Sequence, residues 1–255
     1  GLPVALVICY GPSGHELSRF ALEPDLSDPY VQDTSWLIRD IAFDPAGELH
    51  VLLDSSPERR QLLSFSPDGT PGLPLPLPWG TDQFAVFPDG SFAVSGWQSQ
   101  VGTWVQHISS SGDSLDQWGD QWWAADRHLL VWPACVGFDG EGRILACGGF
   151  LRTDENWNVI PGYSWLNRYS SEGALESLLY LEVYPEVMTW RFAVAPDGSI
   201  VRSDRPIGID QDGNQYLLDT SDYLHCRVTK SDASAFLIAE WDLGMQIVDI
   251  VIGMD

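Results

Sequence analysis

Two segments of the chain combine aromatic rings with carboxylates, a mixture suited to binding. Residues 116–123 hold three tryptophans and two aspartates, and residues 154–163 hold Asp154, Trp157 and Tyr163. An indole ring offers a large, stiff contact area with a polar edge, which suits stacking on sugars, capture of cations or anchoring of a protein partner. Together with Trp97, these segments give the candidate binding residues Trp97, Trp118, Trp122, Trp123, Trp157, Tyr163, Asp120 and Asp154.

Searches for catalytic and metal-binding motifs give little. The five histidines occur singly, without the paired spacing of metal ligands, and neither an HExxH motif nor a glycine-rich phosphate loop is present. Residues 210–214 resemble the start of a calcium loop but lack the rest of its ligand series, so we interpret them as a turn. We therefore assign no catalytic residue, metal ligand or cofactor.

The charge of the chain restricts its partners. Thirty-six acidic residues against 13 basic ones give a formal net charge of −23, so nucleic acid and anionic membrane surfaces would be repelled. The longest apolar run, residues 2–10, is about half the length of a membrane-spanning helix and has no basic residue before it. We expect neither a membrane span nor a signal peptide, and a chain that has already been processed.

Five segments share one pattern, in which two large apolar residues at alternate positions precede a turn glycine. This pattern predicts strands that end in tight hairpin turns. The segments are Ile41–Gly47, Phe84–Gly90, Val136–Gly142, Phe192–Gly198 and Ile207–Gly213.

A second class of hairpin alternates with the first. Its members are Val7–Gly14, Leu63–Gly69, Gln106–Gly112, Asn167–Gly173 and Arg227–Ala233. Two hairpins make four antiparallel strands, and such units recurring at about 40–50 residues are typical of propeller blades. We predict an all-β fold, a single β-propeller domain over residues 1–255.

The number of blades depends on how the hairpins are grouped. The short step from Gly198 to Gly213 leaves no room for two more strands, so residues 190–203 form either a degenerate two-stranded blade or an extra hairpin. We predict six blades including one degenerate blade, with five blades as the alternative. Residues 247–252 read as a strand that completes the N-terminal blade and closes the ring.

Residues 49–69 resemble an NHL-type repeat, in which a strand ends in Asp, an Arg follows and an apolar strand runs to a turn glycine; residues 216–219 and 236–238 resemble it more loosely. The resemblance is to the NHL-repeat and TolB-like propellers, most of which are interaction platforms, with lactonases and lyases among them. A lactonase-like enzyme would need carboxylates and an Asn converging on a divalent metal in the central channel. Candidates for that alternative are Asp40, Asp82, Asn156 and Asp249.

The predicted strand order places every tryptophan except Trp241 in or beside connections on one face of the ring. These rings either form a binding face or pack between neighbouring blades, and the two long segments either bind a ligand or cover the mouth of the ring.

The same strand order places Cys135 opposite Cys147, where they either form a disulfide or remain free core thiols. A disulfide would indicate a periplasmic or secreted protein.

We therefore predict a non-catalytic extracytoplasmic binding module that engages a protein through a tryptophan-rich acidic face, as part of a larger complex or alone. A carbohydrate-binding propeller and a metal-dependent lactonase-like hydrolase or lyase are the alternatives.

Overall fold

The structure is a computed structural model in which antiparallel strands are the only regular elements of the described residues. The described residues are 5–10, 16–22, 37–44, 46–56, 59–98, 102–118, 129–139, 141–156, 159–184, 191–203, 207–219 and 227–242. Within these ranges no helix is long and apolar enough to cross a membrane.

The strands form six antiparallel sheets, four of which have four strands. The first four-stranded sheet consists of β3 (Leu37–Phe43), β4 (Leu49–Ser56), β5 (Arg59–Phe65) and β6 (Leu75–Leu77), and the second consists of β7 (Thr81–Val86), β8 (Phe92–Gln98), β9 (Gly102–Ile108) and β10 (Ser114–Trp118). The third consists of β11 (Leu129–Phe138), β12 (Ile144–Thr153), β13 (Val159–Tyr169) and β14 (Leu175–Tyr184). The last consists of β17 (Ile207–Ile209), β18 (Gln215–Asp219), β19 (Arg227–Ser231) and β20 (Leu237–Asp242). The two-stranded sheets are β1 (Ala5–Tyr10) with β2 (Glu16–Leu22) and β15 (Arg191–Val194) with β16 (Ile200–Ser203).

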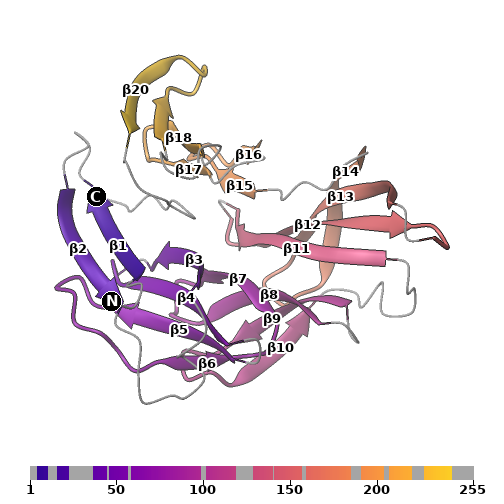
Figure 1. Cartoon of the computed structure of the whole chain (residues 1–255), viewed down its shortest axis with the longest axis horizontal. Helices are drawn as coiled ribbons and strands as arrows, with labels where there is room; N and C mark the ends of the chain where they lie inside the picture. The colour runs from indigo at the N-terminus through magenta and orange to yellow at the C-terminus, as the bar shows by residue number, and fades with distance from the viewer. Residues whose placement is uncertain are drawn as a thin grey trace.

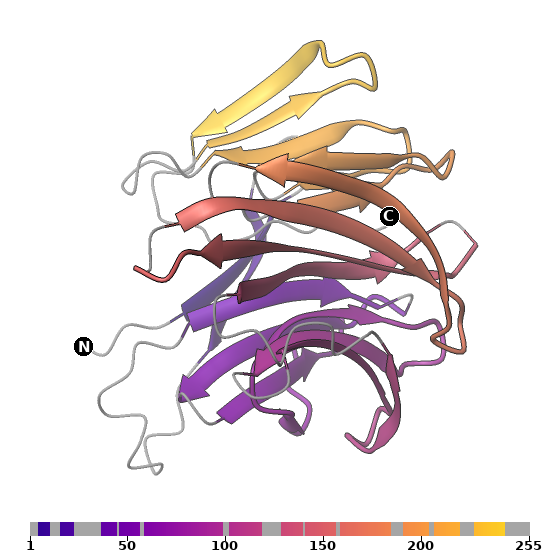
Figure 2. The same ribbon diagram turned by 90° about the vertical axis from the view of Figure 1, so that its right-hand side faces the viewer.

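The sheets follow one another in chain order around a common centre, as Figure 1 shows, and Figure 2 shows the same succession from the side. The first strand of each sheet lies against the first strand of the next, from β3 to β7, β11, β15 and β17. This ring-like succession is the arrangement of a β-propeller.

The predicted number of blades is wrong. The described residues form four complete four-stranded blades, where we predicted six or five. The chain between β16 and β17 is too short for two further strands, so β15–β16 stays a two-stranded sheet, as the degenerate-blade alternative expected. The sheet β1–β2 also has two strands, and the predicted closing strand at 247–252 lies outside the described residues.

Apolar side chains fill the spaces between successive sheets. Leu52, Leu62 and Leu77 of the first four-stranded sheet pack with Phe84, Phe92 and Trp104 of the second. A similar layer joins the second sheet to the third through Ala93, Val105, Ile144 and Tyr169. The three sheets that these layers join bury apolar faces against one another, so they depend on each other for stability.

Polar bonds also join the first strands of different sheets. The backbone N–H of Phe84 on β7 donates to Asp40 Oδ2 on β3 over 2.9 Å, and both residues are buried. Arg191 on β15 donates to Gln83 Oε1 on β7. These contacts fix the inner strands relative to each other.

The predicted turns are confirmed in all but one of the described hairpins, and the turn predicted at Gly14 lies outside the described residues. Glycines 47, 69, 90, 112, 142, 173, 198 and 213 all have a positive φ of 76° to 92°, a conformation that glycine adopts without steric cost. The exception is the last hairpin, which we predicted to turn at Ala233. There the residue with positive φ is Ala235, at 65°, and its N–H donates to Asp232 O over 2.9 Å.

Candidate functional site

The structure describes the backbone of some candidate binding residues and not of others. Trp97 lies near the end of β8, Trp118 ends β10, and Tyr163 lies in β13. Asp154 follows β12 directly. The remaining candidates, Asp120, Trp122, Trp123 and Trp157, lie outside the described residues.

The strand register places two of these tryptophans at one end of the second four-stranded sheet. Trp97 is paired with Thr103 at the start of β9, and Trp118 is paired with Val105. The end of the sheet that they approach is opposite to the hairpin turn at Phe87–Ser91. We call this end of each sheet, opposite to its first hairpin turn, the Trp end.

Asp154 and Tyr163 belong to the corresponding end of the third sheet, where β12 passes to β13. The carboxylate of Asp154 accepts a hydrogen bond from the Asn156 N–H over 2.8 Å. This bond shapes the connection between β12 and β13.

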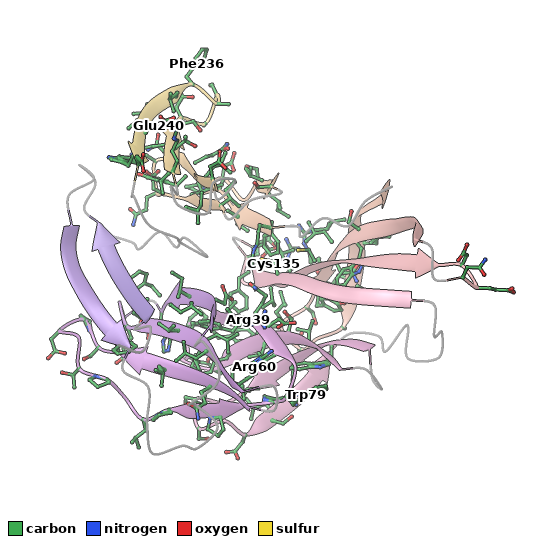
Figure 3. All side chains as sticks on the ribbon, in the orientation of Figure 1. Arg39, Arg60, Trp79, Cys135, Phe236 and Glu240 are labelled. Carbon is green, nitrogen blue, oxygen red and sulfur yellow. The ribbon has the colours of Figure 1, made fainter. Side chains whose placement is uncertain are left out.

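Tryptophans with described side chains divide between surface and core. Trp79, just before β7, is 40% exposed and is labelled on the second sheet in Figure 3. Trp104 is buried in the core between two sheets, and Trp165 packs against the next core layer. Trp241 stacks on Tyr216 with 6.5 Å between ring centroids. Packing between blades, the alternative to a binding face, thus holds for Trp104.

The pairing of the two cysteines is confirmed, because Cys135 and Cys147 are directly opposite across β11 and β12. Cys147 is buried and Cys135 is partly buried. Burial and then a hydrogen bond with Cys135 raise the pKa of Cys147 well above its usual value, which keeps that thiol protonated. The disulfide itself stays a prediction.

Two of the candidates for an axial metal site, Asp40 and Asp82, form hydrogen bonds or an ion pair within the protein. Asp40 accepts hydrogen bonds from the backbone N–H groups of Phe84 and Ile41. Asp82 lies 3.8 Å from Arg60 in an ion pair. Asn156 is exposed beyond the end of β12, and Asp249 lies outside the described residues.

A further cluster, which the sequence analysis missed, lies at the turn between β3 and β4. Asp44, Glu48 and His50 each offer one ligand atom, and these three atoms lie within 4.8 Å of one another. The spacing held a signal, since residues 48 and 50 alternate on an extended segment and share one side. A single histidine beside two carboxylates matches neither paired histidines nor an HExxH motif, so those motifs do not reveal it.

The fold defines an all-β protein of propeller type. Comparison of the sequence with known protein families does not assign it to one of them. No protein-family model matches the chain, and no curated protein matches it.

Solved structures resemble the chain at the level of the fold. A protein of unknown function from Bacteroides caccae has a TM-score of 0.48 and 11% identity, with 98% of each chain covered. The WD40 β-propeller domain of Doa1 has a TM-score of 0.42 and 10% identity, with 84% of this chain and 85% of that one covered. A putative gluconolactonase has a TM-score of 0.39 and 14% identity, with 71% of this chain and 55% of that one covered.

Proposed function

We propose that this protein is a non-catalytic binding module that engages a protein partner at the Trp end of its sheets. The observation that carries the proposal is the register of the second sheet, which brings Trp97 and Trp118 to the same end. Trp79, which precedes β7 at that end, has an exposed ring. Rigid aromatic rings at one end of a fixed scaffold are typical anchors of protein interfaces.

The charge of the chain supports a partner with a basic surface. A formal net charge of −23 accelerates association with cationic proteins and opposes association with acidic ones. Binding to a basic partner should weaken as salt rises, because exposed charges are screened over roughly 8–10 Å at physiological ionic strength.

The proposal includes an extracytoplasmic location, periplasmic or secreted. Cys135 and Cys147 face each other across neighbouring strands, a placement suited to a disulfide in an oxidising compartment. Fractionation of the native host, with the protein followed by antibody, tests the location. Recovery in the cytoplasm would contradict it.

The test of the binding face is quantitative capture from the native host with wild-type and variant baits. Trp97→Ala with Trp118→Ala, and separately Trp122→Ala with Trp123→Ala, should reduce the amount of the specific partner while leaving thermal unfolding unchanged. Trp104→Ala is the contrasting variant, since loss of this buried ring should destabilise the fold by about 3–5 kcal/mol. Unchanged capture by both double variants would refute the proposed face.

Two other outcomes would reassign the function. Binding on a glycan array that is lost in the same tryptophan variants would make the Trp end a carbohydrate site, because sugars stack on indole rings. Hydrolysis of a panel of lactones would indicate an enzyme. The two backbone hydrogen bonds accepted by Asp40 favour a structural role for that carboxylate over an axial metal.

A further inference from the structure

The turn between β3 and β4 holds a carboxylate with one oxygen already used. Asp44 Oδ1 accepts hydrogen bonds from the backbone N–H groups of Ala46 and Glu48, over 2.9 Å and 2.7 Å. Its second oxygen, Oδ2, lies 3.8 Å from His50 Nε2. That distance is too long for a direct hydrogen bond.

His50 is a buried side chain with one ring nitrogen that has no hydrogen-bond partner. Its side chain is 6% exposed, and Nδ1 lies 2.8 Å from Ser64 Oγ. Among the described residues, Nε2 has no hydrogen-bond partner. Since a buried polar atom without a partner is costly, this nitrogen needs an explanation.

The surroundings hold the imidazole in place. The ring packs edge-on against Phe92 with 5.3 Å between centroids, and against Phe84 with 6.5 Å. In the tautomer whose Nδ1 donates to Ser64 Oγ, Nε2 presents a lone pair toward Asp44.

Equivalent turns in other sheets show what such an aspartate normally contacts. In the third sheet, Asp139 Oδ2 is 2.8 Å from Arg143 Nε and 3.3 Å from Arg168 Nε. In the last sheet, Asp210 Oδ2 is 3.4 Å from Lys230 Nζ. Both carboxylates are therefore neutralised by a cation of the chain itself.

The turn at Asp44 has no basic residue at either of the two positions that supply a cation in the third and last sheets. The residue four positions after the aspartate is Arg143 in the third sheet but Glu48 here. The residue across the strands, which is Arg168 in the third sheet and Lys230 in the last, is Ser64 here, opposite His50. Two carboxylates thus stand beside an imidazole, and within the described residues no arginine or lysine forms an ion pair with Asp44.

We infer that Asp44, Glu48 and His50 bind one divalent transition-metal ion, with zinc the best match. One imidazole nitrogen and two carboxylate oxygens are a ligand set that zinc accepts, with bonds of about 2.0–2.2 Å. Ligand atoms already within 4.8 Å of one another need only small side-chain movements to converge. The two negative charges match the charge of the ion, and Ser64 on Nδ1 supplies the outer hydrogen bond that orients a ligating histidine.

Calcium fits this cluster poorly, because it prefers six to eight oxygen ligands and does not favour imidazole nitrogen. The cluster lies at the turn end of the first four-stranded sheet, opposite to the Trp end. The metal site is therefore separate from the proposed partner-binding face.

The test is titration of the purified, metal-stripped protein with zinc chloride, followed by calorimetry and by elemental analysis after dialysis. We expect one ion per chain and a melting temperature that rises with zinc concentration, since a ligand that binds only the folded state stabilises it. With cobalt instead of zinc, the visible absorption should show a nitrogen and oxygen ligand set without thiolate. No stoichiometric binding would overturn the inference.

The variants Asp44→Asn and Glu48→Gln remove one charged ligand each and should weaken zinc binding by more than about tenfold, because even the loss of an outer hydrogen-bond partner typically costs about 10–100-fold. Melting in the absence of metal should change little. Ser64→Lys imitates the last sheet, and its ammonium group should displace the ion. The control is Asp68→Asn, an exposed turn aspartate bonded to Ser66 and Thr70 with no histidine beside it. It should bind zinc like the wild type.

Equal zinc affinity in all four variants would assign the ion to another part of the chain and refute the site. Partner capture by the Asp44 variant should equal that of the wild type, because the Trp end is not involved. Failure of the metal site and failure of the proposed function are thereby distinguishable.

Discussion

Asp40 joins two neighbouring sheets, and its replacement by alanine should measure what that bond contributes. Asp40→Ala leaves the Phe84 N–H without its acceptor in a place where the Phe84 residue is only 3% exposed. A hydrogen bond to a charged group contributes about 1.5–3 kcal/mol, and a buried donor without a partner costs a similar amount. The second bond, to Ile41 N–H, adds less, because it is partly buried and water can replace the acceptor.

We therefore expect Asp40→Ala to lower the free energy of unfolding by about 2–3 kcal/mol. For a chain of this size that corresponds to a fall of roughly 4–12 °C in melting temperature. Asp40→Asn keeps a neutral oxygen that can accept from Phe84 N–H, so it should lose about half as much.

The assay is thermal and urea unfolding followed by circular dichroism, with amide exchange at Phe84 read by mass spectrometry. Exchange at Phe84 should rise more in Asp40→Ala than exchange in the last sheet, which Asp40 does not contact. An alanine variant with wild-type stability and unchanged exchange would refute the structural role and would return Asp40 to the candidates for a functional carboxylate.

Three further predictions concern pH, packing and redox state. Burial acts to raise the pKa of Asp139, but backbone and side-chain hydrogen bonds from Arg143 and its positive charge outweigh this and lower it. The stability that this depressed pKa contributes is fully present above the unfolded-state pKa. Below about pH 5 it is progressively lost as pH falls through the folded-state value. The melting temperature of Asp139→Asn should therefore fall less steeply with decreasing pH than that of the wild type. Gly96→Ala should destabilise the fold by about 1–3 kcal/mol in urea unfolding, because the new methyl group would lie 2.3 Å from the Gly80 carbonyl oxygen. Incubation with oxidised glutathione should link Cys135 to Cys147 with release of two reduced glutathiones, and peptide mapping after unfolding and alkylation should then find both positions unmodified. Alkylation at Cys135 and Cys147 themselves, whatever happens at Cys9 and Cys226, would argue against the bridge.

The strands and turns could be predicted from the sequence because they depend on local chemistry. Alternating apolar residues before a glycine define each first hairpin, and the glycines at 47, 90, 142, 198 and 213 all adopt positive φ. The opposition of Cys135 and Cys147 followed from the same pairing rule. The last hairpin was misplaced because Ala235, rather than a glycine, supplies its positive φ.

Long-range features were beyond that reasoning. A hairpin becomes a four-stranded blade only if two further strands pair with it. For the hairpin at residues 191–203, the short connection to the next strand is the only sequence feature that indicates a two-stranded sheet. The burial of Trp104 depends on the sheet next to it. The cluster at His50 depends on which residue stands across the strand, so the substitution of Ser64 for a cation became visible only once the hairpins were paired.

The tight second hairpins offer a practical route to immobilising the molecule. The loop at Ser66–Thr70 and the loop at Ser109–Asp113 are closed by their own backbone bonds and are largely exposed. A fluorophore or biotin attached at Asp68 would project from the side away from Trp97 and Trp118. A chip coated in that orientation would present the Trp end to solution, so weak partners could be screened without steric interference from the support.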